Sequence, residues 1–135
     1  TWMREILIRY INSYENLTPH SIPNLINCLH KNFVFVDPFN TIKGKENFEL
    51  FLEKMFSRVK NPKFKIKFTL KKKNQVLIKW NFKCLALKNK IDFDGVSEVI
   101  LKDNKVFKHI DYWDSGRNIY GKIPLLGFIF RKIHK

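Results

Sequence analysis

The second half of the chain is dominated by four stretches in which apolar and polar residues alternate. They span Lys63–Lys73, Gln75–Leu87, Ile91–Lys102 and Val106–Asp114, and short polar turns separate them. Alternation places successive side chains on opposite faces of an extended strand, and short polar turns join antiparallel neighbours. We therefore expect four sequential antiparallel strands that form a meander with one solvated face and one face toward a core.

The first of these stretches predicts which side chains reach the core. Its alternation places Phe64, Ile66, Phe68 and Leu70 on one face and lysines on the other. Across the meander the solvated face would then carry many cations: Lys65, Lys67, Lys79, Lys83 and Lys108. Such a charged surface argues against a tight apolar contact with a second copy of the chain through this face.

The first half of the chain is predicted to form helices around one short strand. Apolar residues recur three or four apart in Trp2–Tyr14 and in Lys45–Val59, which is typical of amphipathic helices. Thr18 and Pro19 resemble a helix start, and the second helix, through Leu29, is expected to be interrupted or to restart at Ser21-Ile22-Pro23. Phe33–Val36 predicts a short strand, and Asp37–Asn40 a turn. This order predicts an α+β fold, a curved antiparallel sheet wrapped on three helices, with a pocket at its open end.

The charge of the chain raises the question of an anionic partner. Lysine and arginine total 26 against 12 acidic residues, a formal net charge of +14. A basic protein can bind nucleic acid or a membrane surface. Lysine greatly outnumbers arginine, however, and arginine is the better reader of phosphates and bases. We interpret the charge as compositional, as in an AT-rich genome, and do not expect a nucleic-acid partner.

The last 21 residues, 115–135, form a basic and apolar C-terminal extension of a single domain that spans residues 1–135. Its apolar side chains favour a short helix, Leu125–Ile133, that closes the open end of the cone. The alternative is peripheral contact with an anionic membrane surface, with basic residues at the headgroups. Cys28 and Cys84 sit in apolar contexts and suggest reduced thiols. With no signal-peptide pattern at Thr1, we expect a cytoplasmic protein.

The last alternating stretch contains the candidate functional residues. Alternation places His109, Asp111 and Trp113 on one face, opposite Lys108 and Ile110. An imidazole and a carboxylate pointing inward together indicate a pocket more than a packed core. They could form an acid–base pair, or a satisfied polar patch bonded to its neighbours. A metal site would need more ligands than this pair provides, so we expect no metal and no cofactor.

Four short motifs together resemble the nuclear transport factor two-like superfamily, also called SnoaL-like or ketosteroid-isomerase-like, a cystatin-like fold. They are Arg9-Tyr10, Val36-Asp37-Pro38, Ile42-Lys43-Gly44 and Asp111-Tyr112-Trp113-Asp114. The element order matches through about Ser115. The resemblance implies a cone-shaped sheet with an internal pocket for a small hydrophobic ligand. It does not imply one reaction, because this fold hosts isomerases, cyclases, epoxide hydrolases and non-catalytic binders.

The resemblance also implies roles for particular residues. Tyr10 matches the tyrosine of the ketosteroid-isomerase oxyanion hole, and Asp37 matches its base. Ser97 stands where those enzymes have a second acid, and a serine is a weaker donor to an oxyanion. Asp111 matches the acid–base aspartate of SnoaL-like cyclases. An Asp–Arg–Asp set, used by limonene-epoxide-hydrolase-like members, is not completed because no strand carries an inward-facing arginine.

Two hypotheses follow from these residues. In the first, the protein is a cofactor-independent isomerase, cyclase or hydrolase-type enzyme in which Asp37 or Asp111 is the base and Tyr10 and His109 assist. Four further residues are expected to contact the ligand: Trp113, Trp80, Ser97 and Phe39. In the second, it is a non-catalytic module that binds a ligand or a protein. A homodimer through the exposed sheet face is a further alternative, because the fold commonly pairs in that way.

Overall fold

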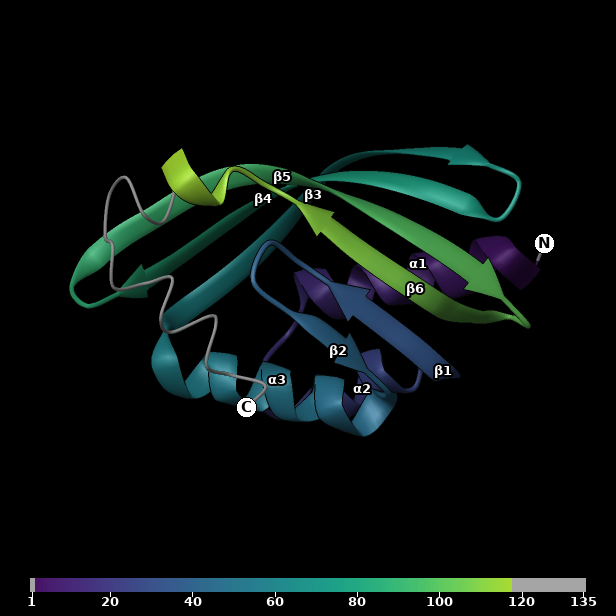
Figure 1. Ribbon diagram of the computed structural model, residues 1–135, viewed down its shortest axis with the longest axis horizontal. Coiled ribbons are helices and arrows are strands. Elements are labelled where there is room, and N and C mark those ends of the chain that lie inside the picture. Colours follow the sequence, from purple (N-terminus) through teal and green to yellow (C-terminus); the bar gives the residue numbers. More distant parts are fainter. Residues whose placement is uncertain (1, 118–135) are drawn as a thin grey trace.

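The computed structural model describes residues 2–117 of the chain, with side chains from Arg4 onward. Three helices lie against one side of a six-stranded sheet (Figure 1). The helices are α1 (Trp2–Glu15), α2 (Ile22–Ile26) and α3 (Lys45–Arg58). The strands are β1 (Leu29–Val36), β2 (Thr41–Lys43), β3 (Lys60–Lys72), β4 (Gln75–Ala86), β5 (Asn89–Lys102) and β6 (Lys105–Tyr112).

The sheet is mixed, with strand order β2-β1-β6-β5-β4-β3. Its curvature wraps the strands around the helices, as Figure 1 shows. Strands β3 to β6 form the expected antiparallel meander, and β2 pairs antiparallel with β1. Strands β1 and β6, however, pair in parallel, with Phe35 opposite His109. The α+β cone with three helices is confirmed, and the parallel pair is an addition that sequential hairpins do not predict.

The core lies between the inner face of the sheet and the helices. Helix α3 buries its predicted apolar stripe, including Phe48, Phe51 and Leu52. The ring of Phe48 lies 5.1 Å from that of Phe33 and 4.8 Å from that of Phe35, so aromatic side chains of β1 interlock with the helix. From α1, Tyr10 is completely buried. This packing fixes α1 and β6 relative to each other, which positions the site described below.

The junction between α2 and β1 differs in part from the prediction. Helix α2 begins at Ile22, within the expected restart at Ser21-Ile22-Pro23, because Thr18 and Ser21 exchange backbone-to-side-chain hydrogen bonds in a turn. Strand β1 begins at Leu29, four residues earlier than predicted, because Leu29 pairs with Val106 of β6. Long-range pairing therefore overrides the local helical pattern at this junction.

A bulge in β3 changes which side chains of that strand face the core. Phe64 and Ile66 oppose the buried Phe82 and Trp80 and face inward as expected. The register then shifts between Ile66 and Phe68, so that Phe68 opposes Lys79 and Leu70 opposes Leu77. One extra residue in a strand reverses its alternation. The prediction that Phe68 and Leu70 face the core is therefore wrong.

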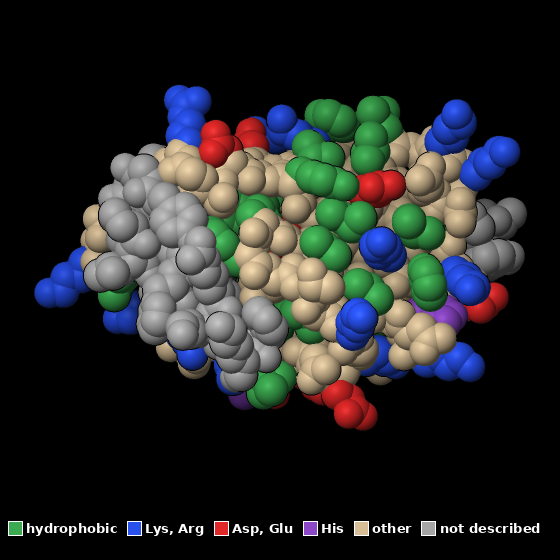
Figure 2. All heavy atoms as spheres, viewed as in Figure 1, with side chains coloured by type: hydrophobic (Ala, Val, Ile, Leu, Met, Phe, Trp, Pro, Cys, Tyr) green, Lys and Arg blue, Asp and Glu red, His purple; other side chains and the backbone are tan. Residues whose placement is uncertain are grey.

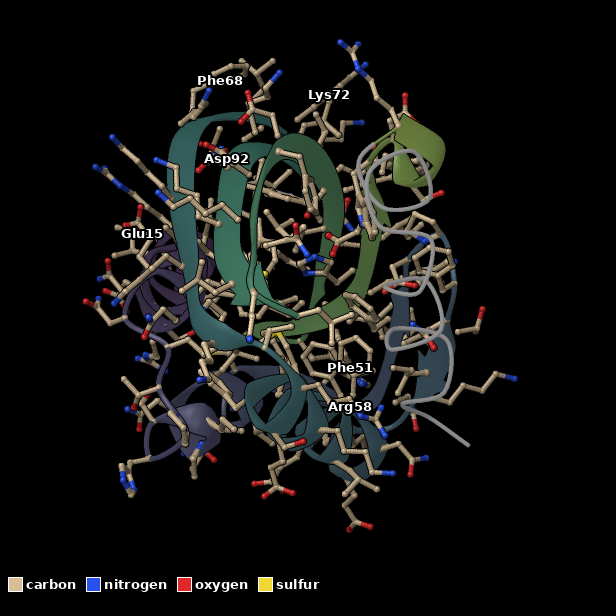
Figure 3. All side chains as sticks on the ribbon, turned by 90° about the vertical axis from the view of Figure 1, so that its left-hand side faces the viewer. Glu15, Phe51, Arg58, Phe68, Lys72 and Asp92 are labelled. Atoms are coloured by element: carbon tan, nitrogen blue, oxygen red, sulfur yellow. The ribbon has the colours of Figure 1, made fainter. Side chains whose placement is uncertain are left out.

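The outer side of the strands carries both charged and apolar side chains. In Figure 3, Phe68 and Lys72 project outward from the sheet, whereas Phe51 lies on its inner side near α3. Within residues 2–117, none of the helices is both long and apolar enough to cross a bilayer. The C-terminal extension and its predicted helix lie outside the described residues, apart from its first three residues.

Candidate active site

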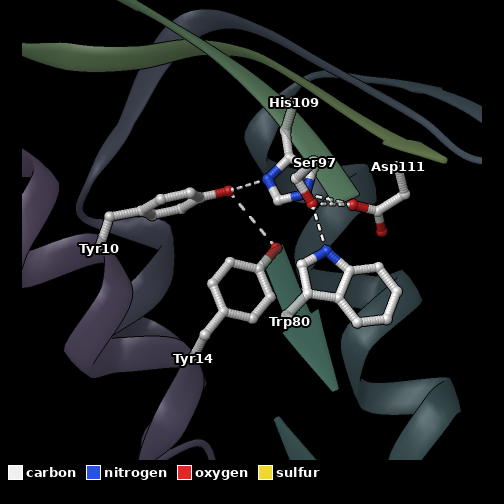
Figure 4. Close-up of polar contacts among 6 residues, drawn as sticks. All are labelled: Tyr10, Tyr14, Trp80, Ser97, His109 and Asp111. Atoms are coloured by element: carbon white, nitrogen blue, oxygen red, sulfur yellow. Dashed lines mark hydrogen bonds and ion pairs between the residues drawn. The ribbon is translucent and has the colours of Figure 1, made fainter. Parts of the chain in front are cut away.

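A chain of buried hydrogen bonds centres on Asp111 of β6 (Figure 4). Its Oδ1 atom lies 2.6 Å from Nε2 of His109, and the same oxygen accepts a hydrogen bond from the hydroxyl of Ser97. The other carboxylate oxygen points away from both donors, as Figure 4 shows. The His109 side chain is 6% exposed and that of Asp111 17%. The predicted inward phase of β6 thus brings an imidazole and a carboxylate into direct contact.

The other ring nitrogen of His109 meets helix α1. The Tyr10 hydroxyl lies 2.7 Å from Nδ1 of His109, and 3.4 Å from the Tyr14 hydroxyl. Because a carboxylate only accepts, Nε2 of His109 carries the proton that Asp111 receives. In the neutral imidazole, Nδ1 then accepts from Tyr10. The contacts from Asp111 through His109 and Tyr10 to the Tyr14 hydroxyl thus form one continuous row of hydrogen bonds.

Both phenols are held in their neutral form. Burial, and next the neighbouring Tyr14, raises the pKa of Tyr10 well above its usual value of 10.0. Burial, and next the charge of Asp111, also raises the pKa of Tyr14. At neutral pH both hydroxyls are hydrogen-bond donors and not phenolates.

Strands β4 and β5 contribute the second donor to Oδ1 of Asp111. The indole N–H of Trp80 donates to the Ser97 hydroxyl at 2.8 Å, and Ser97 donates onward to Asp111. Trp80 fits here because it faces Gly95 across the strand pair. A Cβ atom at Gly95 would lie only 2.4 Å from the indole ring. Trp80 and Ser97 therefore orient the carboxylate from inside the core.

Two small cavities adjoin this network. The first, of about 20 Å³, is lined by Tyr10, Trp80, Ser97 and His109 among others. The second, of about 60 Å³, is lined mainly by aromatic and aliphatic side chains of the sheet and α3. Asp111, Tyr14 and Phe64 line both. The rings of Tyr14 and Phe64 meet edge to face, with centroids 5.3 Å apart, so these two side chains form the partition between the cavities.

Asp37 faces the second cavity together with Asp111 and Trp113. Its Oδ1 atom accepts from the backbone N–H groups of Phe39 at 2.8 Å and Asn40 at 2.6 Å. Its Oδ2 atom meets only the Asn40 side-chain amide, at 3.3 Å, among the described residues. Burial raises the pKa of Asp37 from 3.8 to about 6, although these hydrogen bonds lower it, and Asp111 raises it further. Asp37 is thus both a turn-former and a carboxyl group that titrates near neutrality.

The structure places the predicted site residues in two groups. Tyr10, Trp80, Ser97, His109 and Asp111 share the first cavity, whereas Asp37 and Trp113 join Asp111 at the second. Phe39 does not line either cavity, and its ring meets Trp113 edge to face at 5.7 Å. Of the three side chains that line both cavities, the sequence analysis predicted Asp111 and missed Tyr14 and Phe64.

Tyr14 and Phe64 each carried a signal in the sequence. Tyr14 follows Tyr10 by four residues and so shares its helix face. Phe64 was assigned to the core face of its strand, where it lies. Their role at a partition depends on how α1 crosses β3, which periodicity does not describe.

The described residues form neither a metal site nor an Asp–Arg–Asp set. No cluster of three or more His, Cys, Asp or Glu side chains that could hold a metal occurs in the part of the chain that the structure describes. The arginines within the described range are Arg4, Arg9, Arg58 and Arg117, and none of them lines either cavity. An Asp–Arg–Asp arrangement is therefore not formed by these residues.

The α+β cone with acidic and aromatic side chains inside defines the nuclear transport factor two-like, or ketosteroid-isomerase-like, class of protein. Within this class the sequence matches the family model of the SnoaL-like domain over residues 10–109. The chain therefore belongs to the SnoaL-like domain family. No curated protein matches the sequence.

Solved structures share the fold at low sequence identity. The M. tuberculosis LEH-like epoxide hydrolase is 17% identical with a TM-score of 0.74, and the match covers 95% of this chain and 92% of that one. TerC, co-crystallised with polyporic acid, is 13% identical with a TM-score of 0.76, covering 87% and 95%. A Catenulispora acidiphila DSM 44928 protein with a ketosteroid-isomerase-like fold, in complex with trimethylamine, is 13% identical with a TM-score of 0.73, covering 84% and 88%.

Proposed function

We propose that the protein binds a small, mainly apolar molecule bearing one oxygen function and catalyses a proton transfer on it, without a cofactor. The observation that supports this most is the pair of carboxyl groups at one apolar cavity, Asp37 and Asp111. A general base works best when its pKa lies near the working pH, and that of Asp37 is raised to about 6.

Asp37 is the better base of the two. Among the described residues its Oδ2 atom has a single weak contact, with Asn40, so we take it as the oxygen that receives a proton from a ligand carbon. Asp111, in contrast, is held at Oδ1 by His109 and Ser97. We assign Asp111 the role of holding His109 in position and, through His109, Tyr10.

Tyr14 is a better candidate than Tyr10 for the donor to a developing oxyanion. The Tyr10 hydroxyl is engaged by His109 at 2.7 Å, and its ring is fully buried. Tyr14 is only partly buried and lines both cavities. A neutral phenol at that position can donate to a carbonyl oxygen as charge develops on it.

The size of the cavities limits the ligand. An apolar cavity of roughly 150 Å³ is needed to hold benzene, whereas the two cavities here measure about 20 and 60 Å³. A ring-sized ligand therefore requires Tyr14 and Phe64 to turn aside and join the two spaces. Two proteins with this fold support the proposal of a ligand with an oxygen function. One is TerC, co-crystallised with polyporic acid, and the other is the LEH-like epoxide hydrolase of M. tuberculosis. Because no described arginine faces the cavities, we favour proton transfer over an Asp–Arg–Asp epoxide opening.

Deuterium exchange at a carbon next to a carbonyl group tests this proposal directly. The protein is incubated in D₂O with 2-tetralone, an activated bicyclic ketone, and loss of the α-proton signal is followed by NMR. We expect exchange above the buffer rate, and a loss of about 100-fold or more in Asp37→Asn, as is typical for removal of a general base. The control is Asp92→Asn, which removes an exposed carboxylate from β5. Equal exchange by wild type and Asp37→Asn would refute the assignment.

A second candidate function is that of a non-catalytic module that binds a small ligand or a protein. One observation favours it. The hydrogen bonds of Tyr10, His109, Asp111, Ser97 and Trp80 close on one another, as in a polar network that stabilises a core. In that case 2-tetralone or related ketones would raise the melting temperature without any exchange of their α-protons.

A further inference from the structure

The positive charge of the protein is concentrated in one hairpin. Residues 60–90, which cover β3, β4 and the turns around them, contain eleven lysines and no acidic residue. This segment therefore carries +11 of the formal net charge of +14. A compositional bias alone would spread lysine and the acidic residues along the whole chain.

The same hairpin exposes large apolar side chains among its lysines. Beyond the bulge, every residue from 67 to 75 is exposed. Phe68 is 54% exposed and Leu70 60%, and Leu77 on the neighbouring strand is 44% exposed. Leu70 lies directly opposite Leu77, and Phe68 opposite Lys79. The bulge thus turns side chains that alternation assigns to the core onto the charged outer face.

The outer surface around these residues is hollowed and mixed in character. A shallow groove of about 340 Å³ is lined by Leu70, Leu77, Lys71 and Lys72, with Gln75 and Glu98 at its side. Toward β6, the exposed Tyr112 continues the apolar surface. Figure 2 shows hydrophobic side chains gathered over the upper strands, with lysine or arginine side chains around them. The hairpin tip itself projects at the edge of the molecule (Figure 1).

We propose that this hairpin docks on an anionic phospholipid membrane, with Phe68, Leu70 and Leu77 entering the interface and Lys71, Lys72 and Lys73 at the headgroups. Exposed aliphatic side chains beside a cluster of lysines fit a surface that is both apolar and negative. A second copy fits this hairpin less well, because lysines of the two copies would face each other. Nucleic acid also fits less well, since two of the three side chains proposed to enter the partner, Leu70 and Leu77, offer no stacking surface for bases. This inference does not depend on the proposed proton transfer.

Vesicle sedimentation with the full-length chain tests this inference. Vesicles of phosphatidylcholine alone are compared with vesicles that also contain phosphatidylserine, at low and at high salt. We expect binding only to the second kind, weakened by salt. Each lysine near an anionic surface contributes on the order of a fivefold gain in affinity, so Lys71→Gln/Lys72→Gln/Lys73→Gln should weaken binding about 100-fold. Leu70→Ser/Leu77→Ser should weaken it by at least about tenfold through lost apolar burial.

Matched controls lie on other faces. Leu50 of α3 is 46% exposed, so Leu50→Ser removes a comparable leucine from the helical side of the sheet (Figure 1). Lys31, Lys43 and Lys45 supply a triple glutamine control on β1, β2 and α3. Both controls should bind like wild type.

Three results would overturn the inference. If the hairpin variants bind phosphatidylserine vesicles like wild type, the hairpin is not the docking surface. If Leu70→Ser/Leu77→Ser instead converts a dimer to a monomer in sedimentation velocity, a second copy occupies the surface. If duplex DNA displaces the protein from vesicles and only the lysine variant loses DNA binding, the partner is a nucleic acid.

Discussion

Replacing Asp37 by Asn should make the protein more stable at neutral pH, which is unusual for a residue in a tight turn. The folded-state pKa of Asp37 is raised to about 6, from 3.8 in the absence of the fold. Between these values the folded state holds a proton that the unfolded state has released. Stability therefore falls as pH rises from about 4 to about 6, and the loss persists above pH 6. A difference of about two pH units corresponds to about 3 kcal/mol.

Asn cannot ionise, yet its side-chain oxygen can still accept the N–H groups of Phe39 and Asn40 that now bond Oδ1 of Asp37. We therefore expect Asp37→Asn to gain up to about 3 kcal/mol over wild type at pH 7.5, and almost nothing at pH 4. Urea unfolding of both proteins across this pH range measures the difference, with Asp92→Asn as a surface control expected within about 0.5 kcal/mol of wild type. A variant that is destabilised at pH 7.5, or a difference that does not change with pH, would refute the reasoning.

Four further substitutions probe the buried network and the partition. Tyr10→Phe should cost about 1–3 kcal/mol because it leaves Nδ1 of His109 buried without its partner; Tyr14→Phe, which loses only a 3.4 Å contact, should cost less in the same urea titration. Phe64→Ala should join the two cavities and lower the free energy of unfolding by about 2–4 kcal/mol. The variant should also bind bicyclic ketones more tightly, as measured by calorimetry, and unchanged ligand affinity would argue against the partition. Gly95→Ala should cost about 1–3 kcal/mol by crowding the indole of Trp80, and adding Trp80→Phe should restore part of the loss.

Much of the fold could be predicted because apolar residues recur along the sequence with the period at which a strand or helix turns its side chains toward the core. The alternation around His109 and Asp111 predicted that both point inward, and they do, because β6 is solvated on one face only. The stripe of α3 was equally informative, since a helix between sheet and solvent needs one apolar face. The order of these elements, together with the four short motifs, indicated the SnoaL-like family.

Other features depend on contacts that a local pattern does not contain. The bulge in β3 reverses the faces of Phe68 and Leu70, and a single extra residue leaves alternation in the sequence looking regular. The early start of β1 depends on its parallel partner 77 residues later, where Leu29 meets Val106. The position of Tyr14 between two cavities depends on the packing of α1 across β3. The division of labour between Asp37 and Asp111 follows from hydrogen bonds and burial, not from spacing.

The parallel pairing of β1 with β6 also determines when the protein can fold. Strand β1 lies between β2 and β6 in the sheet. It can pair with β6 only after β6 has left the ribosome, so until then one edge of β1 stays unpaired. The bond between Tyr10 and His109 spans 99 residues and forms at the same stage. Contacts of such long range slow folding, and no N-terminal fragment that ends before β6 can assemble the candidate site. Truncated translation products would expose the strand edge of β1 and its phenylalanines, which makes them targets for aggregation or for chaperones.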